Sequence, residues 1–259
     1  MTMNLTDIND IRELLARHGF RFSKSLGQNF LTADWVPRRI ADSALIDGET
    51  GVLEIGPGIG CLTNELSKRA AKVVSVELDK SLGPVLAETL AGADNVEIIY
   101  GDVLRQDLRA LAGERFAGLR PVVCANLPYN VTSPVLTEII ESGVFDTVTV
   151  MIQREVARRI CAPANTPDYG AFGIFVQWYT EPELLFDVPP SCFIPQPKVT
   201  SSVIRLRRRS APPAAVRDEK LLFRIVRAAF NQRRKTLVNA LSSSTGLDKA
   251  ELELRLRGS

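Results

Sequence analysis

Apolar runs with the length of β-strands alternate with helix-like segments through most of the chain. The apolar runs cover residues 51–56, 72–79, 95–102, 120–127 and 146–153. Segments with the spacing of amphipathic helices follow them, near 60–70, 80–91, 103–112, 133–142 and 153–161. Strands that are apolar along almost their whole length, each followed by a helix, are typical of a parallel sheet covered by helices on both faces. The sequence therefore predicts an α/β fold.

The alternation changes in the last third of the chain. A helix is expected near 170–180, and two strand-like runs follow it at 183–188 and 201–207 with no helix between them. Parallel neighbours need a crossover connection, whereas antiparallel strands do not. We therefore expect these two strands to form a hairpin that gives the sheet an antiparallel edge.

The C-terminal part of the chain is strongly basic. Residues 205–236 contain eleven Lys or Arg side chains against two acids, although the net charge of the whole chain is +2. The Pro- and Ala-rich stretch 210–216 is typical of a linker, and a helical run follows it. We predict a first domain over residues 1–209 and a small all-α domain over residues 210–259. The charge favours a polyanionic partner such as a nucleic acid over an ordinary solvated surface.

Residue content disfavours several classes of protein. The chain has four cysteines with no Cys-x-x-Cys pair, and His18 is its one histidine. A zinc site and a His-based catalytic triad are both unexpected, so we predict chemistry without a metal or an imidazole. No apolar run approaches the roughly 18 residues of a membrane span, and the N-terminus lacks the apolar block of a signal peptide. We therefore expect a cytoplasmic protein, and nothing demands more than a monomer.

A glycine-rich turn follows the first strand of the predicted sheet. Its sequence, Glu-Ile-Gly-Pro-Gly-Ile-Gly, contains Glu54, Gly56 and Gly58. Acids end the next two strands, Glu77 and Asp102. Glycines let a backbone approach a ligand at a helix N-terminus, and ligands bind at the carboxyl ends of parallel strands. The alternative is a structural βα turn with acids nearby, but the combined set favours a cofactor site.

The fourth strand ends in Asn126-Leu127-Pro128-Tyr129. The exocyclic amine of adenine is a poor nucleophile because its lone pair is delocalised into the ring. The Asn126 side-chain carbonyl and the Leu127 backbone carbonyl offer two acceptors for the amine protons, which favours a pyramidal nitrogen. Pro128 fixes φ, and Tyr129 supplies a flat face on which an extruded base can stack. The alternative is a plain Asn-x-Pro turn with a core tyrosine.

These motifs resemble those of a known enzyme class. The Glu-x-Gly-x-Gly-x-Gly turn, with Glu77 and Asp102, resembles the S-adenosylmethionine-dependent methyltransferases. That resemblance implies a Rossmann-like class I methyltransferase sheet. It also implies that the glycine loop passes the amino-acid part of the cofactor, that Glu77 holds the ribose hydroxyls, and that Asp102 contacts adenine. The Asn-Leu-Pro-Tyr tetrapeptide is similar to the (Asn/Asp)-Pro-Pro-Tyr motif of amino-methyltransferases, and in particular to that of the RNA adenine dimethyltransferases.

Three further segments resemble that narrower family. They are Lys24-Ser-Leu-Gly-Gln-Asn-Phe-Leu31, Phe193-Ile-Pro-Gln-Pro-Lys-Val199 and Phe230-Asn-Gln-Arg-Arg-Lys-Thr-Leu237. The first implies cofactor contacts by Asn29 and Leu31. We assign Gln28 to the same site, and the alternative for the side chains of Gln28 and Lys24 is a solvated loop. The second implies that Phe193 covers the target base opposite Tyr129; by itself it would be a core aromatic. The third opens the family's C-terminal helical domain.

From the residues and the resemblance we assign three groups of site residues. The catalytic group is Asn126, Leu127, Pro128, Tyr129 and Phe193. The cofactor-binding group is Gln28, Asn29, Leu31, Gly56, Gly58, Glu77, Asp102 and Asn126. The RNA-binding group is Lys24, Lys198, Arg205, Arg207, Arg208, Arg233, Arg234 and Lys235. We expect the basic segments on either side of the linker to line one cleft.

The resemblance covers about residues 20–240. It implies transfer of methyl groups from S-adenosylmethionine to the N6 amines of two adjacent adenines near the 3′ end of 16S ribosomal RNA, during small-subunit maturation. The alternatives are a macrolide-resistance-type methyltransferase of large-subunit RNA, a DNA adenine methyltransferase, and a non-catalytic binder on the same fold. The chain ends soon after its second C-terminal helix, where family members continue, so the completeness of the RNA-binding domain stays open.

Overall fold

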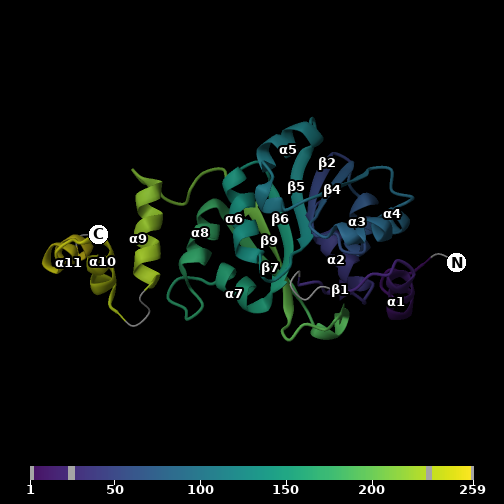
Figure 1. Ribbon diagram of the computed structural model, residues 1–259. Helices are drawn as coiled ribbons and strands as arrows, with labels where there is room; N and C mark the ends of the chain where they lie inside the picture. The colour runs from purple at the N-terminus through teal and green to yellow at the C-terminus, as the bar shows by residue number, and fades with distance from the viewer. Residues whose placement is uncertain (1–2, 23–26, 232–234, 258–259) are drawn as a thin grey trace.

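A seven-stranded mixed sheet forms the centre of the protein, as the computed structural model shows (Figure 1). The structure describes residues 3–22, 27–231 and 235–257. The strand order across the sheet is β4-β3-β2-β5-β6-β9-β7. The strands are β2 (Thr50–Ile55), β3 (Lys72–Glu77), β4 (Val96–Tyr100), β5 (Arg120–Asn126), β6 (Thr147–Gln153), β7 (Thr180–Val188) and β9 (Ser201–Arg208). The predicted α/β class is confirmed.

Strands β2 to β6 run parallel, and the antiparallel pairing begins at β9. Strand β9 lies between β6 and β7 and is antiparallel to both. The predicted hairpin is therefore present, and the structure adds that its second strand is inserted between its first strand and the parallel part. Both edges of β9 are therefore hydrogen-bonded to neighbouring strands, and β7 is the outermost strand.

Helices cover both faces of the sheet. They are α1 (Ile8–Arg17), α2 (Trp35–Ser43), α3 (Cys61–Ser67), α4 (Gly83–Thr89), α5 (Leu108–Arg115), α6 (Thr132–Ser142), α7 (Arg154–Cys161) and α8 (Ala171–Tyr179). Neighbouring residues of one strand pack on opposite faces: Leu53 joins the core under α5, α6 and α8, whereas Val52 joins the core under α2 and α3. Alternation of this kind explains why the strands are apolar almost throughout.

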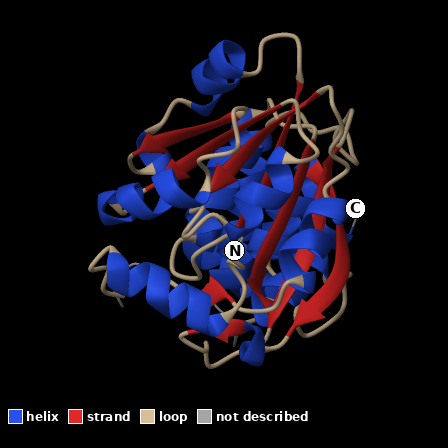
Figure 2. Cartoon of the chain, turned by 90° about the vertical axis from the view of Figure 1, so that its right-hand side faces the viewer, coloured by secondary structure: helices blue, strands red, loops and turns tan. Residues whose placement is uncertain are grey.

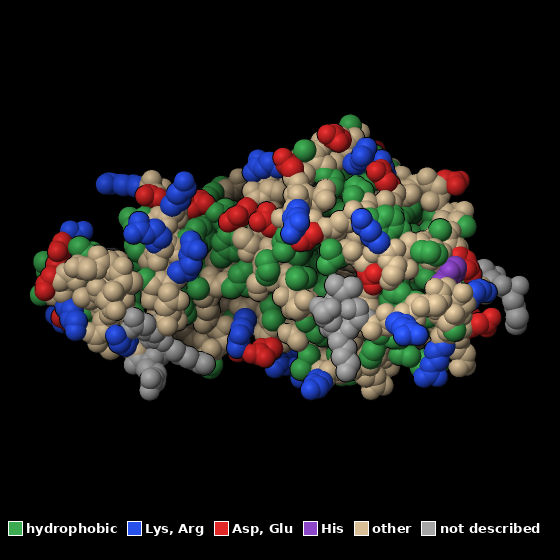
Figure 3. All heavy atoms as spheres, in the orientation of Figure 1, with side chains coloured by type: hydrophobic (Ala, Val, Ile, Leu, Met, Phe, Trp, Pro, Cys, Tyr) green, Lys and Arg blue, Asp and Glu red, His purple; other side chains and the backbone are tan. Residues whose placement is uncertain are grey.

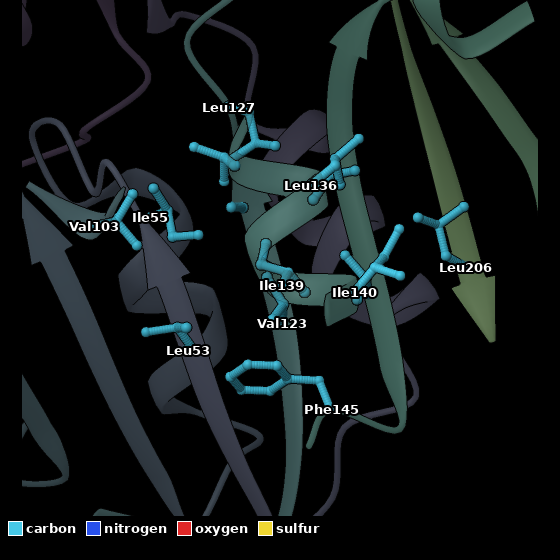
Figure 4. Packing of buried hydrophobic residues seen from close by; sticks show 14 of the residues in the cluster. Leu53, Ile55, Val103, Val123, Leu127, Leu136, Ile139, Ile140, Phe145 and Leu206 are labelled. Atoms are coloured by element: carbon cyan, nitrogen blue, oxygen red, sulfur yellow. The ribbon is translucent and has the colours of Figure 1, made fainter. Parts of the chain in front are cut away.

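The larger core lies between the sheet and helices α5 to α8. Figure 4 shows side chains of β2 and β5 meeting those of α6, among them Leu53, Val123 and Ile139. Leu127, which belongs to the predicted site, is also part of this core and is 1% exposed. Figure 2, at right angles to the first view, shows the strands fanning out across the molecule with helices packed against them. The sheet is thus a firm support for the loops at its edge.

Two predicted helices begin later than the sequence suggested, each after a short 3₁₀ segment. Those segments are Lys80–Leu82 before α4 and Val103–Arg105 before α5. The Asp107 side chain accepts hydrogen bonds from the backbone N–H groups of Arg109 and Ala110, which caps α5 at its start. Asp107 therefore starts a new helix instead of continuing the 3₁₀ turn.

The C-terminal helices lie beyond α8, at the opposite end of the molecule from α1 (Figure 1). They are α9 (Glu219–Asn231), α10 (Leu237–Thr245) and α11 (Lys249–Arg257). They have a small core of their own around Ala228, Leu241 and Leu252. The stretch 209–218, between β9 and α9, forms no helix or strand. The division of the chain into domains 1–209 and 210–259 stays a prediction.

Throughout the described ranges, no helix combines the length and the apolar character that crossing a membrane requires.

Candidate active site

A single cavity at the carboxyl ends of the parallel strands contains all the predicted catalytic and cofactor-binding residues. The cavity is open to solvent, and about 1200 Å³ of space lies within it when its open mouth is included. Its lining includes Gln28, Asn29, Leu31, Gly56, Gly58, Glu77, Asp102, Asn126, Leu127, Pro128, Tyr129 and Phe193. These residues come from the ends of β2, β3, β4 and β5 and from two segments far apart in the sequence. The fold therefore brings motifs that are separated along the chain into contact with one cavity.

The glycine turn forms a backbone cradle at one wall of the cavity. Gly56 has φ +70° and Gly58 has φ +59°, conformations that L side chains rarely adopt. A Cβ atom at Gly58 would lie 3.2 Å from Cε1 of Phe30, so a side chain there would also crowd the wall. The turn leads into α3, whose N-terminal N–H groups favour negative charge. The cradle therefore suits a ligand that approaches the backbone closely.

Glu77 joins the glycine cradle to the end of β3. Its carboxylate accepts a hydrogen bond from the Gly58 N–H at 3.3 Å and one from the Asp79 N–H at 2.7 Å. The side chain is 6% exposed, and this burial raises the pKa of Glu77 above its ordinary value. An acceptor held at the floor of a cavity in this way can bind hydroxyl groups of a ligand.

Asp102 lies at the end of β4 with its side chain 37% exposed. It accepts a hydrogen bond from the Leu104 N–H at 3.0 Å, and Arg105 lies 3.8 Å from its second oxygen. Two apolar residues follow the acids and also line the cavity: Leu78, which is 55% exposed, and Leu104, which is 36% exposed. Large exposed leucines beside two acids suit a flat ring that carries polar groups.

The N-terminal loop reaches the cavity through a small separate sheet. Strand β1 (Phe30–Leu31) pairs antiparallel with β8 (Phe193–Ile194), with Leu31 opposite Phe193. The Gln28 amide donates a hydrogen bond to Asp79 Oδ2 at 2.7 Å, and Asn29 donates to the Gly27 carbonyl at 2.9 Å. Two predicted motifs that lie more than 160 residues apart are thus hydrogen-bonded neighbours.

The Asn126–Tyr129 loop projects from β5 toward the cavity. The Leu127 N–H donates to the Met151 carbonyl at 3.1 Å, and its side chain is anchored in the core, where Figure 4 labels it. Pro128 lies against the glycine turn, with its Cδ 3.8 Å from the position of a Cβ at Gly56. Among the described residues, the Asn126 side-chain amide has no hydrogen-bond partner. The loop therefore presents an anchored, uncommitted amide to the cavity.

Two aromatic rings line the cavity near this loop. The Tyr129 hydroxyl lies 2.6 Å from Ser201 Oγ, and burial raises the pKa of this phenol. Phe193 is 3% exposed and also belongs to the core beneath α2. Both rings are thus at the same cavity as Asn126, whereas the predicted sandwich around a base stays a prediction.

Glu54 is the acid of the glycine motif, and it lies buried behind the cradle. It is 1% exposed, and its Oε2 accepts hydrogen bonds from Thr63 Oγ1 at 2.7 Å and from Ser75 Oγ at 2.6 Å. Burial raises the pKa of Glu54 to about 7, even though these two hydrogen bonds act in the opposite direction. Glu54 therefore holds the start of α3 to β3 by way of a carboxyl that is partly protonated near neutral pH.

We expect the free energy of unfolding to fall as the pH rises across the range in which Glu54 titrates. The unfolded chain loses the Glu54 proton near 4.5, whereas the folded chain keeps it to about 7. A shift of this size corresponds to about 3 kcal/mol. Replacing Glu54 by Gln removes the titration. The free energy of unfolding of the variant, measured relative to that of the wild type, should therefore be about 2 to 3 kcal/mol higher at pH 8 than at pH 5. Urea unfolding at both pH values measures this change; a difference between variant and wild type that is independent of pH would contradict the account.

The predicted RNA-binding residues do not share one location, in contrast to the catalytic and cofactor-binding residues. Lys24, Arg233 and Arg234 lie outside the described residues. Lys198 and Lys235 are exposed, and so is Arg208 at the end of β9. Arg207 is 51% exposed, with Glu183 4.0 Å away. These side chains are accessible to a polyanion. Arg207 would have to exchange its ion pair with Glu183 for a phosphate.

Arg205 differs from the other predicted RNA contacts. Its side chain is 11% exposed, donates to the Ser43 carbonyl at 3.0 Å and pairs with Glu183 at 2.6 Å. On β9 the side chain points to the α2 face, because α2 contains Ser43. A guanidinium held in this way stabilises the packing of β9 against α2 and β7. A contact of Arg205 with RNA stays a prediction.

Within the described residues, the basic side chains near the end of β9 lie in two places. Because Arg233 and Arg234 lie outside those residues, one cleft lined by both basic segments stays a prediction. Arg208 and Arg209 border a groove between α8 and α9, together with Lys220, Arg224 and Arg227 of α9. Arg205 and Arg207 lie instead beside Glu183 of β7. Figure 3 shows Lys and Arg side chains gathered over the C-terminal helices at the left of the view. The basic surface thus includes α9 as well as the motif residues.

Several residues at the cavity or in contact with its lining were not identified from the motifs. Leu78 directly follows Glu77, and Leu104 lies two residues after Asp102. Their positions next to the two acids could have identified them. Ser201, which contacts Tyr129, has no sequence signal because its role depends on strand pairing. In the described part of the chain, no group of three or more His, Cys, Asp or Glu side chains is placed to hold a metal ion.

Known proteins resemble this chain over most of its length. The family profile described as Ribosomal RNA adenine dimethylase matches residues 19–255. The Ribosomal RNA small subunit methyltransferase A of Geobacillus thermodenitrificans (strain NG80-2) is 51% identical over 244 residues, which cover 93% of this chain and 83% of the relative. The protein of the same name from Clostridium perfringens (strain 13 / Type A) is 48% identical over 241 residues, covering 92% and 84%.

Two solved structures share the fold. The 23S rRNA methyltransferase ErmE has a TM-score of 0.65 and 30% identity, and the match covers 83% of this chain and 84% of that one. A dimethyladenosine transferase from Plasmodium falciparum has a TM-score of 0.67 and 26% identity, covering 82% and 74%. Since the family profile spans nearly the whole sequence, and relatives about half identical share it, the chain belongs to the ribosomal RNA adenine dimethylase family.

Proposed function

We propose that this protein transfers methyl groups from S-adenosylmethionine to the N6 amines of two adjacent adenines near the 3′ end of 16S ribosomal RNA, in the cytoplasm, during small-subunit maturation. Family membership supports an RNA adenine dimethyltransferase. Relatives about half identical are named for the small ribosomal subunit, which supports the choice of substrate. The product would be N6,N6-dimethyladenosine.

The cavity fits S-adenosylmethionine, which when bound supplies a methyl group on a sulfonium ion. The left-handed glycines at 56 and 58 leave room for its amino-acid part beside the backbone. The Glu77 carboxylate is placed to accept hydrogen bonds from ribose hydroxyls. Asp102 can accept from the exocyclic amine of the cofactor's adenine, with Leu78 and Leu104 as the apolar walls. Gln28, Asn29 and Leu31 complete the site from the N-terminal loop.

The observation that carries the proposal is the unpartnered Asn126 amide at the cavity. A buried or half-buried amide normally satisfies its hydrogen bonds within the fold, so an uncommitted amide at a cavity is available for a substrate. The Asn126 side-chain oxygen and the Leu127 backbone carbonyl would accept hydrogen bonds from the two N–H groups of the target amine. Their pull localises the nitrogen lone pair toward the methyl donor, and no residue has to titrate near neutral pH. In the transfer the methyl–sulfur bond breaks as the methyl–nitrogen bond forms, the cofactor leaves as the neutral thioether, and the extra proton on nitrogen passes to water. Positioning is then the largest catalytic contribution.

The target adenine must leave its RNA stack to reach Asn126. Tyr129 offers a ring on which the extruded base stacks, and Phe193 would cover its other face. Stacking on an aromatic ring is worth about 1 to 3 kcal/mol per base. Pro128 keeps the loop between them in one conformation, because its ring fixes φ.

The RNA backbone would be held by exposed basic side chains. Of the predicted RNA-binding residues, Lys198, Arg207, Arg208 and Lys235 are exposed in the described part of the chain. Lys24, Arg233 and Arg234, which lie outside the described residues, belong to the same proposed surface. We further propose that residues 210–259 act as a separate RNA-binding domain and that the protein works as a monomer.

A second candidate is methylation of large-subunit RNA. It is favoured by the 30% identity and shared fold with the 23S rRNA methyltransferase ErmE. The relatives named for the small subunit are more similar, at 51% and 48% identity, which favours the first candidate.

Radiolabelled methyl transfer distinguishes the candidates. The protein is incubated with methyl-labelled S-adenosylmethionine and, in separate reactions, undermethylated small subunits, undermethylated large-subunit RNA or adenine-unmethylated DNA. Label is expected in the small-subunit RNA at least about 100-fold above the other two. Preferential label in large-subunit RNA would establish the second candidate, and label in none of the three would contradict both.

A further inference from the structure

The Tyr129 hydroxyl is bonded to a residue outside every motif identified above. Its oxygen lies 2.6 Å from Ser201 Oγ, the first residue of β9. The two residues are 72 positions apart in the sequence. This bond is therefore a feature of the fold that joins the catalytic loop to the antiparallel part of the sheet.

Ser201 is a buried residue on a strand that is paired on both sides. It is 0% exposed, and its strand lies between two others. Its backbone is in register with Gln153 of β6 on one side and with Val188 of β7 on the other. A hydroxyl fixed in this way moves little, so whatever it bonds takes a defined position.

Stacking on a base needs the face of an aromatic ring and makes no use of a phenolic hydroxyl. The Tyr129 hydroxyl is thus free for another task. Burial raises the pKa of the phenol, so the group keeps its proton across the neutral range. The ring is then held at both ends: at its Cα by the loop after Leu127, and at its far end by Ser201.

We propose that Ser201 is a positioning residue that fixes the ring of Tyr129 in the orientation needed to stack the target base. The proposal rests on the proposed function, because the stacked base is the adenine to be methylated. Ser201 itself does not touch the substrate. It restricts rotation of the Tyr129 ring before the base binds. Less conformational entropy is then lost when the transition state forms.

Replacing Ser201 by Ala should lower kcat about 10- to 30-fold, because small misplacements of a substrate-positioning group cost up to about 100-fold. The affinity for S-adenosylmethionine, measured by calorimetry, should stay within about twofold. Tyr129→Phe keeps the ring and removes the same bond, so it should lose about the same factor. The double variant should be no worse than either single one, because the two changes remove one interaction. Losses that multiply in the double variant would overturn the proposal.

The matched control is Ser202→Ala. Ser202 is also 0% exposed, and its hydroxyl bonds to Asp187 Oδ1 at 2.5 Å instead of to the catalytic loop. It removes a buried hydroxyl from the next position of the same strand and should leave kcat within about twofold. An equal loss of kcat in both serine variants would show a general effect on β9 and would overturn the role of Ser201.

A second measurement does not depend on activity. The chain has four tyrosines, so labelling tyrosine with ¹³C at Cζ gives a spectrum of four signals, and Tyr129→Phe identifies the one from Tyr129. Ser201→Ala should shift that signal and leave the other three in place, whereas Ser202→Ala should shift none. An unmoved Tyr129 signal would overturn the proposal whatever the activity. If Ser201→Ala shifts the Tyr129 signal but the wild-type protein methylates no RNA, the role of Ser201 in holding the ring stands and the proposed function is refuted.

Discussion

Replacing Asn126 by Ala is expected to lower kcat about 1000-fold while the affinity for S-adenosylmethionine changes less than about threefold. The Asn126 side chain has no partner among the described residues and lies at the cavity beside the glycine cradle. Its oxygen is therefore available for the amine proton of the target adenine. Losing one preorganised polar group at a reacting centre costs about 100- to 1000-fold in kcat. Single-turnover methylation and calorimetry with the cofactor measure the two effects separately.

Asn126→Asp is the matched variant for this prediction. Aspartate has nearly the same shape and keeps an acceptor oxygen but has no N–H groups. If acceptance of the amine proton is the task of Asn126, the aspartate variant should retain at least about a tenth of the turnover, in contrast to the alanine variant. Equal inactivity of both variants would show that the amide N–H groups are needed, and the acceptor mechanism would be wrong.

The second large effect is expected at Glu77, where alanine should weaken the affinity for S-adenosylmethionine about 30- to 100-fold. Glu77 accepts the N–H groups of Gly58 and Asp79, so it shapes the cradle as well as offering an acceptor to the ligand. Hydrogen bonds to charged groups contribute about 1.5 to 3 kcal/mol, and the Gly58 N–H would lose its partner. Calorimetric titration of the cofactor measures the loss. An affinity within about threefold of the wild type would refute the proposed role of Glu77 in the cofactor site.

Glu97→Ala provides the control for Glu77→Ala. Glu97 lies on the neighbouring strand β4, is 34% exposed and forms ion pairs with Lys72 and Arg115, both at 3.2 Å. Its loss should leave cofactor affinity unchanged, because exposed ion pairs contribute about 0 to 1 kcal/mol to stability. At saturating cofactor, Glu77→Ala should also recover most of its kcat, since its main loss is in binding.

Much of the sheet could be predicted because its signal is local. Each of β2, β3, β5 and β6 is an almost continuous apolar run, and burial on both faces favours that pattern. The place of β9 between β6 and β7 could not be predicted in the same way. Strand order depends on pairing between segments far apart in the sequence, and apolar runs do not specify their neighbours.

The cavity was also predictable in its parts, since glycines, acids and the Asn-Leu-Pro-Tyr loop all follow strands, and strand ends meet at one rim. The meeting of Leu31 with Phe193 was not, because it depends on the pairing of β1 with β8. The same holds for Ser201 and Tyr129. For Arg205 the sequence gives the charge but not the burial. Its contacts with Ser43 and Glu183 depend on how β9 packs against α2 and β7.

The central claim is that the cavity brings a methyl donor to the N6 amine of adenine in small-subunit RNA. The most direct test is mass spectrometry of nucleosides and nuclease fragments of 16S RNA, after reaction of undermethylated small subunits with the protein and S-adenosylmethionine. The account predicts N6,N6-dimethyladenosine at two adjacent adenines near the 3′ end, and none with Asn126→Ala. Methylation at another atom or another base, or an Asn126→Ala variant that forms the same product at the same rate, would contradict it.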